Sequence, residues 1–343
     1  MKIKRIGVDL AKNVFQVHGV DGNEQPVWRR RLSRKSWLKV LLETVDPGCV
    51  IGMEACSSAH HWARQLQAQG FTVKLIAPQF VKPYLKSNKN DANDAEAVCE
   101  AMSRPSMHFV AVKSVGQQDI QAVHRIRSEL ISQRTAKANQ IRGLASEYGL
   151  VAPQELRRLC RAIPDWLEDP ENGLSERFRW LLNGLWDDLK GLDARVAELD
   201  REIASIAREE PAARRLQQLR GVGPITATAL VAAVGDGAQF ANGRQMSAAL
   251  GLTPRQHSSG GKDRLLGISK RGDSYLRTLL IHGARAVIRT AKHKEDRLSQ
   301  WVTALLERRH PNVVAAALAN KTARIAWAML RNGTDYEPNH VTC

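Results

Sequence analysis

The first hundred residues alternate short apolar runs with helix-like segments, and this order restricts the N-terminal part of the chain to a layered α/β fold. Strand-like runs over residues 3–10, 14–20 and 26–32 follow one another with only short polar turns between them. Ser33 is expected to cap a helix that ends near Glu43. Strands over 49–53 and 72–76 then alternate with helices near 59–69 and 91–102.

Isolated acids interrupt this apolar pattern. Asp9 lies inside the first run and Glu54 ends the fourth, where an uncompensated carboxylate is unfavourable. Asp91 and Asp94 open the last helix, and their spacing of three places both on one helix face. Helix capping explains one of these two aspartates but neither Asp9 nor Glu54. We therefore predict that all four meet at one edge of the sheet and hold Mg²⁺ or Mn²⁺, hard cations that take oxygen ligands.

Three strands followed by alternating helices and strands is the order of the ribonuclease H-like fold. A set of carboxylates on a basic chain also indicates metal-assisted phosphodiester chemistry. Lys12, just after Asp9, is a candidate contact to a phosphate or to the carboxylate, and an ordinary solvated lysine explains it equally well.

The charge of the chain favours a polyanionic partner, and nucleic acid is the first candidate. Its 343 residues carry 51 Lys and Arg against 35 Asp and Glu, a net charge of +16. Residues 1–115 have 17 basic and 10 acidic side chains, residues 116–254 have 18 of each, and residues 255–343 have 16 and 7. We therefore expect the two ends to contact phosphates and the neutral middle to act as a spacer or an association region.

Cysteine usage and hydropathy favour a cytoplasmic protein. The five cysteines are odd in number and form no CxxC pair, which predicts neither a disulfide framework nor a zinc site. The N-terminus does not read as a signal peptide, and the apolar stretch 227–234 is too short to span a bilayer.

The middle of the chain reads as helical. Residues 116–148 are strongly basic on one side, and Pro153, Pro164 and Pro170 punctuate the next segment. Residues 178–208 read as one long helix with apolar side chains at near-heptad spacing. These are Leu181, Leu185, Leu189, Leu192, Val196, Leu199, Ile203 and Ile206. This pattern is typical of a coiled-coil arm or of one amphipathic helix packed on its own domain, and both readings stay open.

Two glycine-containing segments stand out in the C-terminal part. Residues 219–227 resemble a helix-hairpin-helix turn, in which the amides of Gly221 and Gly223 could face a phosphate, or form an ordinary connection between helices. Residues 253–272 are basic and rich in hydroxyl groups, and they precede expected helices over 273–289, 295–307 and 313–330. Within them Ser258 and Ser259 are either part of a linker or candidates for a nucleophile. The surrounding cations could neutralise a phosphate; they are Arg255, Lys262, Arg264, Lys270, Arg271 and, further on, Arg277.

Several blocks of sequence resemble one family. The segments Gly7-Val-Asp-Leu-Ala-Lys12, Gly52-Met-Glu-Ala55 and Asn90-Asp-Ala-Asn-Asp-Ala95 look like the DEDD tetrad of a family of insertion-sequence transposases related to Piv-type DNA invertases. The C-terminal blocks of that family are matched by Gly221-Val-Gly-Pro224, Gly251-Leu-Thr-Pro-Arg255, Ser258-Ser-Gly-Gly-Lys262 and Ile268-Ser-Lys-Arg-Gly-Asp-Ser-Tyr-Leu-Arg277. The resemblance covers nearly the whole chain in the family's order.

The resemblance implies a RuvC-like domain joined through a coiled coil to a mainly α-helical transposase domain with a catalytic serine. That serine falls on Ser259 here, with Ser258 as the neighbouring alternative. It further implies double-stranded DNA as substrate, at element ends and target, and a structured bridge RNA as guide. A homo-oligomer, dimer or tetramer, would bring the acids of one subunit near the serine of another.

We accordingly expect a RuvC-like catalytic domain over 1–112, a helical linker and coiled-coil arm over 113–210, a transposase domain over 211–335 and a loose tail over 336–343. The alternative activities are a RuvC-like junction nuclease that uses water and a non-catalytic nucleic-acid-binding protein. A sugar kinase of the actin-like superfamily is suggested only by residues 7–10, without the later Gly-rich phosphate loops.

Overall fold

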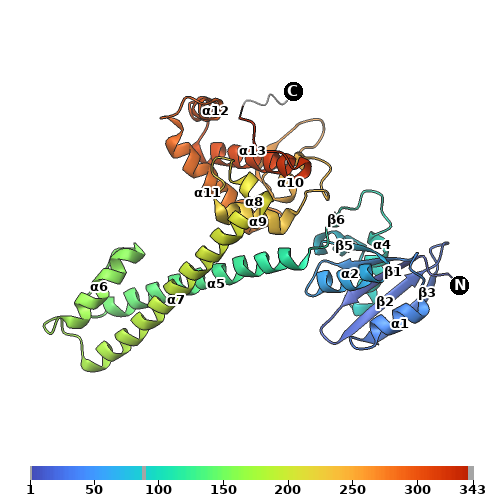
Figure 1. The fold of residues 1–343 in the computed structure, drawn as a ribbon, viewed down its shortest axis with the longest axis horizontal. Helices are drawn as coiled ribbons and strands as arrows, with labels where there is room; N and C mark the ends of the chain where they lie inside the picture. Colours follow the sequence, from blue (N-terminus) through green and yellow to red (C-terminus); the bar gives the residue numbers. More distant parts are fainter. Residues whose placement is uncertain (1, 87–89, 339–343) are drawn as a thin grey trace. The chain divides into compact units, whose positions relative to one another are not determined.

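The computed structural model describes residues 2–86 and 90–338. Lys89, at the start of the predicted acidic motif, and Cys343, with most of the predicted tail, lie outside the described residues. The chain divides into two compact units: residues 1–115 with 234–241, and residues 116–233 with 242–343. Figure 1 shows the course of the chain through these elements.

The first unit is built on a mixed sheet, which confirms the predicted α/β N-terminal region. Its strands are β1 (Arg5–Leu10), β2 (Val14–Val20), β3 (Pro26–Ser33), β4 (Val50–Glu54), β5 (Thr72–Ile76) and β6 (Phe109–Val110). They lie in the order β3-β2-β1-β4-β5-β6. β1, β4 and β5 are parallel to one another, whereas β2, β3 and β6 pair antiparallel with their neighbours. Three carboxyl ends of strands therefore meet at one edge of the sheet.

Helices cover both faces of this sheet. The helices of the unit are α1 (Trp37–Thr44), α2 (Ala59–Ala68), α3 (Pro78–Val81) and α4 (Asp91–Ala101), with a 3₁₀ turn at Lys82–Tyr84. α1 begins after Ser36, so the prediction that Ser33 caps it is wrong. Ser33 instead ends β3 and bonds Ser36 through its hydroxyl at 2.8 Å.

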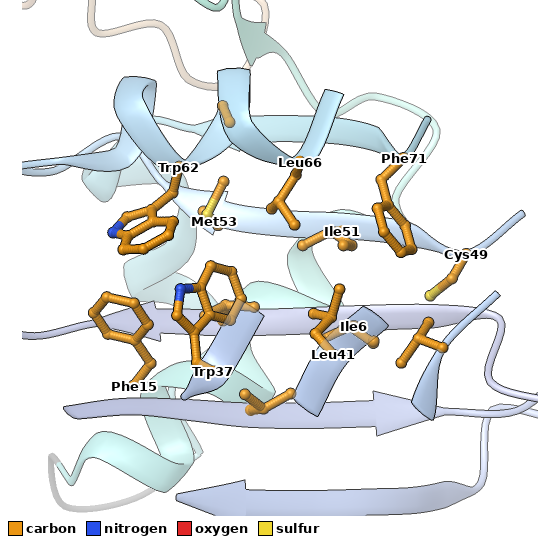
Figure 2. Packing of buried hydrophobic residues seen from close by; sticks show 14 of the residues in the cluster. Ile6, Phe15, Trp37, Leu41, Cys49, Ile51, Met53, Trp62, Leu66 and Phe71 are labelled. Atoms are coloured by element: carbon orange, nitrogen blue, oxygen red, sulfur yellow. The ribbon is translucent and has the colours of Figure 1, made fainter. Parts of the chain in front are cut away.

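The larger core lies between the sheet and helices α1 and α2. Trp37 and Leu41 of α1 and Trp62 and Leu66 of α2 are buried on the strand face that carries Ile6. Figure 2 shows these side chains, with the rings of Phe15, Trp37 and Trp62 packed together. The ring centroids of Trp37 and Trp62 are 5.1 Å apart in an edge-to-face arrangement, which aromatic pairs favour. A second cluster, which includes Val98 and Met102, lies under α4 on the opposite face.

Within its described residues, the regular structure of the second unit is helical apart from one hairpin, which confirms the predicted helical C-terminal part. Its long helices are α5 (Val115–Ser146), which begins in the first unit, and α7 (Glu176–Glu209), with α6 (Leu156–Glu168) between them. The remaining helices are α8 (Pro211–Leu216), α9 (Pro224–Val234), α10 (Gly243–Ala249), α11 (Ser274–Ala291), α12 (Arg297–Leu306) and α13 (Pro311–Asn332). The hairpin strands β7 (Pro254–Gln256) and β8 (Leu265–Ile268) precede α11. α6 continues through Pro164, so that proline does not end a segment as expected.

Three cations on the basic side of α5 form ion pairs with acids of α7. Arg127 pairs with Asp200, Arg134 with Asp193, and Lys137 with Asp188 at 2.9 Å. Between these helices the buried seam of α7 runs through Phe178, Leu182, Leu189, Val196 and Ile203. Leu181, the first residue of the predicted heptad pattern, is 46% exposed. The predicted long amphipathic helix is thus observed, and its predicted positions Leu189, Val196 and Ile203 are buried. Only the first position was wrong, because Leu182 is buried in place of Leu181.

His124 is not part of this basic side, because it is only 4% exposed. Its Nε2 lies 2.9 Å from Thr228 Oγ1 of α9, and its Nδ1 lies 3.0 Å from Tyr275 OH of α11. Thr228 donates its own hydroxyl hydrogen to the carbonyl of Pro224 at 2.8 Å. The imidazole therefore donates from Nε2 to Thr228, and in the neutral ring Nδ1 accepts from Tyr275. Burial and, to a smaller extent, the charge of Arg127 together lower the pKa of His124 to about 4.

No helix in the described ranges is long and apolar enough to cross a bilayer. The apolar stretch 227–234 lies within α9, where most of its side chains are buried in the second unit.

Candidate active site

Asp9 and Glu54 occupy matching positions on neighbouring parallel strands. Val8 of β1 is paired with Met53 of β4, and the two acids are the next residues along each strand. Side chains two apart on a strand share a face. Asp9 therefore points to the same side as Gly7, and Glu54 to the same side as Gly52, which is the side that α4 covers.

Two glycines let α4 lie directly on the strands. A Cβ on Gly7 would stand 2.2 Å from the carbonyl oxygen of Ala95 and 2.5 Å from the amide nitrogen of Cys99. A Cβ on Gly52, its partner in the sheet, would meet the sulfur of Met102 at 2.6 Å. The first contact is to helix backbone, which cannot rotate away. Glycine at position 7 therefore sets the distance between α4 and the strand that carries Asp9.

The first turn of α4 carries the other two acids. Asn90 caps the helix by accepting a hydrogen bond from the amide of Asn93 at 2.8 Å, so Asp91 and Asp94 are not needed as caps. Carboxylate oxygens of Asp9, Asp91 and Asp94 all lie within 4.8 Å of one another. Asp9 and Asp94 are half-buried and Asp91 is exposed. The structure thus brings together three of the four predicted ligands.

Glu54 is outside that group of three, although it lies nearby. Burial raises the pKa of the Cys56 thiol, and the carboxylates of Glu54 and Asp9 raise it further. Both acids are therefore close enough to Cys56 to affect it electrostatically.

The arrangement of oxygens fits a divalent cation. Two oxygen ligands on opposite sides of Mg²⁺ are about 4 Å apart. Small side-chain rotations can bring three oxygens within 4.8 Å of one another to that spacing. The donor set is all carboxylate, which suits Mg²⁺ or Mn²⁺ better than zinc.

Cations that the sequence analysis missed lie on the same face of the sheet. Arg29 of β3 stands opposite His18 of β2, and both contact Glu96 of α4, at 3.5 and 3.9 Å. Lys86 also bonds Glu96 at 2.9 Å, and this contact is the main cause of the lowered pKa of Glu96. A cavity of about 230 Å³ opens here, lined by Arg29, Arg31 and Glu96 among others. Strand alternation puts Arg29 and Arg31 on the same face of the sheet as Asp9. The sequence could have predicted this only if the pairing register of β1, β2 and β3 had been known.

The two candidate serines lie at the tip of the β7–β8 hairpin in the second unit. Ser259 pairs with Lys262 across a turn in which Gly260 and Gly261 both have positive φ, 57° and 77°. Two successive residues with positive φ are the requirement of the tight turns that suit hairpins. The predicted linker is therefore an ordered turn.

The hydroxyls of the two serines differ. Ser258 Oγ accepts from Gln256 Nε2 at 3.0 Å and from the amide of Arg264 at 3.3 Å. Ser259 is exposed, and within the part of the chain that the structure describes its Oγ has no hydrogen-bond partner. Ser258 thus holds the hairpin together, whereas Ser259 is available to a ligand.

The cations predicted around the serines divide into two kinds. Five are exposed and form no ion pair with any described residue; they are Arg255, Lys262, Arg264, Lys270 and Arg271. Arg277 instead donates to the carbonyls of Leu250 and Arg271, at 3.1 and 3.3 Å. It therefore ties the base of the hairpin to α10. Lys12 is exposed, in the turn that follows β1.

Glycines explain why the C-terminal motifs are packed together. A Cβ on Gly251 would stand 2.1 Å from the carbonyl oxygen of Arg271, and one on Gly272 would stand 1.8 Å from that of Ala249. In the predicted helix-hairpin-helix turn between α8 and α9, Gly221 lies against Gly283 of α11. Gly221 thus has a packing role, whereas a Cβ on Gly223 would meet open space.

Comparison with known proteins assigns the family. A family model described as Transposase matches residues 6–149, and the model of the Transposase IS116/IS110/IS902 family matches residues 213–299. A probable family 20 transposase of Pseudomonas aeruginosa is 53% identical over 98% of this chain and 100% of its own length. The transposase for insertion sequence element IS1111A of Coxiella burnetii is 47% identical, covering 97% of this chain and 91% of its own. That for IS1328 of Yersinia enterocolitica is 42% identical over 96% and 97%. The resemblance seen in the motifs is thereby confirmed: the chain belongs to the IS116/IS110/IS902 family of insertion-sequence transposases, enzymes that cleave and join DNA strands.

Proposed function

We propose that the chain recombines the DNA of its insertion sequence with a metal-assisted serine nucleophile. In this proposal residues 1–112 are a RuvC-like domain of ribonuclease H fold and 113–210 a coiled-coil arm. Residues 211–335 are the transposase domain with the serine, and 336–343 a tail. The strand order β3-β2-β1-β4-β5, with acids at the carboxyl ends of β1 and β4, supports the first assignment.

Asp9, Asp91 and Asp94, with Glu54 beside them, would hold Mg²⁺ or Mn²⁺. When bound, this ion would polarise the scissile phosphate and neutralise developing negative charge. Gly7 and Gly52 keep α4 against the sheet, and Asn90 caps it, so the carboxylates of two distant segments are held together before a ligand arrives. Lys12, exposed in the turn after β1, is the proposed phosphate contact beside Asp9.

Ser259 Oγ would attack the phosphorus of the DNA strand. A new ester bond forms between Oγ and phosphorus while the bond to the leaving strand oxygen breaks, and the serine proton ends on the released hydroxyl. Attack by a different hydroxyl end then reverses the step and frees the serine. Each step exchanges one phosphodiester bond for another, so no ATP is required. The proposed phosphate contacts are Arg255, Lys262, Arg264, Lys270 and Arg271. Arg277 would hold the base of the hairpin in place through its hydrogen bonds to Leu250 and Arg271.

The partners are part of the proposal. We propose double-stranded DNA at element ends and target, a structured bridge RNA as guide, and a dimer or tetramer in which one subunit's acids meet another's serine. The site of action is the bacterial nucleoid. The basic surplus of residues 1–115 and 255–343 supports nucleic acid as the ligand.

The convergence of Asp9, Asp91 and Asp94 within 4.8 Å carries this proposal. Its test uses DNA that contains the element's own ends, with covalent protein–DNA complexes separated on denaturing gels. Ser259→Ala should abolish the covalent complex and strand cleavage. Ser258→Thr, which keeps the hydroxyl that bonds Arg264, should retain both. Asp94→Asn should abolish cleavage while DNA binding persists.

The outcomes separate the alternatives. Cleavage by Ser259→Ala at the wild-type rate would show that water is the nucleophile, as in a RuvC-like junction nuclease. Unchanged binding by all variants with no metal-dependent cleavage by the wild type would indicate a non-catalytic nucleic-acid-binding protein.

A further inference from the structure

A cavity of about 920 Å³ lies in the second unit. None of its lining residues belongs to the hairpin that carries Ser259. Its walls come from α10, α12, α13 and the segment 334–338. These three helices are labelled close together in Figure 1. The side chains that matter for its chemistry are Arg244, Arg297, Trp301, Lys321, Arg324 and Tyr336.

The helix contacts that form this cavity are fixed by local sequence. A Cβ on Gly243, at the start of α10, would stand 2.9 Å from both the Cα and the carbonyl oxygen of Arg324. Glycine therefore lets α10 press onto α13. In α12, Asp296 caps the helix through the amide of Ser299 at 3.0 Å, and Arg297 and Trp301 follow at a spacing of four on one face.

The remaining wall is tied down by hydrogen bonds. The amide of Tyr336 donates to Gln218 Oε1 at 2.7 Å, and Gln218 Nε2 donates to Asp335 at 3.0 Å. The segment after α13 is thereby held against the residues that follow α8, with Tyr336 half-buried in the cavity wall.

The charges of the lining are not balanced. Arg244, Arg297, Lys321 and Arg324 have no ion pair with any residue in the described ranges, although all four are exposed to the cavity or its rim. The two acids of the lining are Asp335, which accepts from Gln218, and Glu337. The nearby Asp296 pairs with Arg220 at 2.6 Å. Four cations against two acids give the cavity a positively charged lining, which favours an anionic ligand.

Aromatic rings stand beside these cations. Lys321 Nζ lies over the ring of Trp301, 5.4 Å from its centroid. Lys321 thus covers one face of the Trp301 ring, and a base that stacked on this face would displace the flexible lysine side chain. Cations that follow a phosphate backbone, combined with aromatic faces for stacking, are the combination that binds unpaired nucleotides. A duplex keeps its bases stacked on one another and has none to offer such a ring.

We propose that this cavity binds unpaired nucleotides of single-stranded DNA or RNA, with a base on Trp301 and phosphates on Arg297, Lys321 and Arg324. Its volume is within the range of pockets that enclose ligands of this size. The site requires neither Ser259 nor the acidic cluster. It is therefore independent of the proposed recombination mechanism, and either can fail alone.

The test measures binding of the full chain to fluorescent oligo(dT), oligo(rU) and a duplex of equal length, in EDTA so that no metal-dependent step occurs. Trp301→Leu should raise the Kd for single strands about tenfold, because one stacked base is worth roughly 1–3 kcal/mol. Trp301→Phe should stay within about threefold of the wild type because it keeps a ring for stacking. The Kd for the duplex should not change.

Two further measurements sharpen this test. Trp180→Leu removes a tryptophan that is 74% exposed on α7 and should leave all three Kd values unchanged. Arg297→Gln with Arg324→Gln should lower the slope of log K against log salt for single strands by roughly 1.4, since each phosphate contact contributes about 0.7. A stronger effect on oligo(dT) or on oligo(rU) supports the site and identifies the strand it takes.

The proposal is overturned if Trp301→Leu has the circular dichroism spectrum of the folded wild type and binds single strands with the same Kd. It is also overturned if that variant loses duplex and single-strand binding equally.

Discussion

Replacing Gly7 by alanine should separate α4 from the strand that carries Asp9. The new Cβ would stand 2.2 Å from the carbonyl oxygen of Ala95, whereas ordinary van der Waals contacts begin near 3.4 Å. The Cβ is fixed rigidly to the strand and the oxygen belongs to the helix backbone, so the conflict is relieved only if the helix moves. The required displacement is about 1.2 Å, and it moves Asp91 and Asp94 away from Asp9.

The consequence for function should exceed the consequence for stability. Overpacking a well-packed core costs about 1–3 kcal/mol, a loss that a folded unit can tolerate. Metal ligands, in contrast, keep their distances to within about 0.2 Å. A misplacement of about 1 Å can reduce catalysis by roughly a hundredfold. We therefore expect Gly7→Ala to fold and yet to lose most metal-dependent strand cleavage.

The assay pairs Mn²⁺ titration, followed by electron paramagnetic resonance of the free ion, with cleavage of element-end DNA. Gly52→Ala is the matched control in the neighbouring strand, because its Cβ meets the flexible end of Met102 rather than backbone. Gly22→Ala is the control without a neighbour, since nothing lies within 4 Å. Cleavage and Mn²⁺ affinity of Gly7→Ala equal to those of Gly52→Ala would refute the reasoning.

Three other expectations concern the second unit. The pKa of His124 is lowered to about 4 in the folded chain against 6.5 when unfolded, so the unfolded state takes up the proton first as pH falls. The contribution of His124 to the free energy of unfolding is therefore complete above about pH 6.5, and about 3 kcal/mol of it is lost as the pH falls to 4. In urea unfolding, His124→Gln should show a shallower dependence of this free energy on pH. Gly283→Ala would place its Cβ 2.0 Å from the carbonyl oxygen of Gly221, and we expect thermal unfolding at a lower temperature without a change in the acidic cluster. Leu189→Ala should destabilise the unit by about 2–5 kcal/mol and Leu181→Ala by well under 1 kcal/mol; equal effects in urea unfolding would place the buried seam elsewhere.

The fold of the N-terminal unit was largely predictable because its strands are short apolar runs separated by turns. The position of Asp9 and Glu54 followed from those runs, and the placement of Asp91 at the start of a helix followed from local capping chemistry. β6 was not predictable, since two residues pair with β5 only through long-range contact. The phase of α7 was predictable from Leu189 onward. Its first position was not, because Leu181 and Leu182 are equally apolar and only the partner helix decides which one is buried.

The site was predictable where chemistry is local and not where it depends on assembly. A carboxylate in an apolar strand can be recognised from the sequence alone, and so can a serine beside two glycines. The arginines of β3 and the cavity beside Trp301 give no such signal, because exposed cations are common in any basic chain. Their meaning depends on strand register and on helices that meet only after folding.

The three ion pairs between α5 and α7 have a mechanical consequence. Sliding one helix past the other by a single turn, about 5.4 Å, would break Arg127–Asp200, Arg134–Asp193 and Lys137–Asp188 together. The three pairs therefore favour the observed alignment of the two helices over a register shifted by one turn. With 34 residues, α7 measures about 50 Å, comparable to some fifteen base pairs of duplex DNA. The two helices can therefore act as a spacer of fixed length. Added salt would weaken the ion pairs between them but would not change that length.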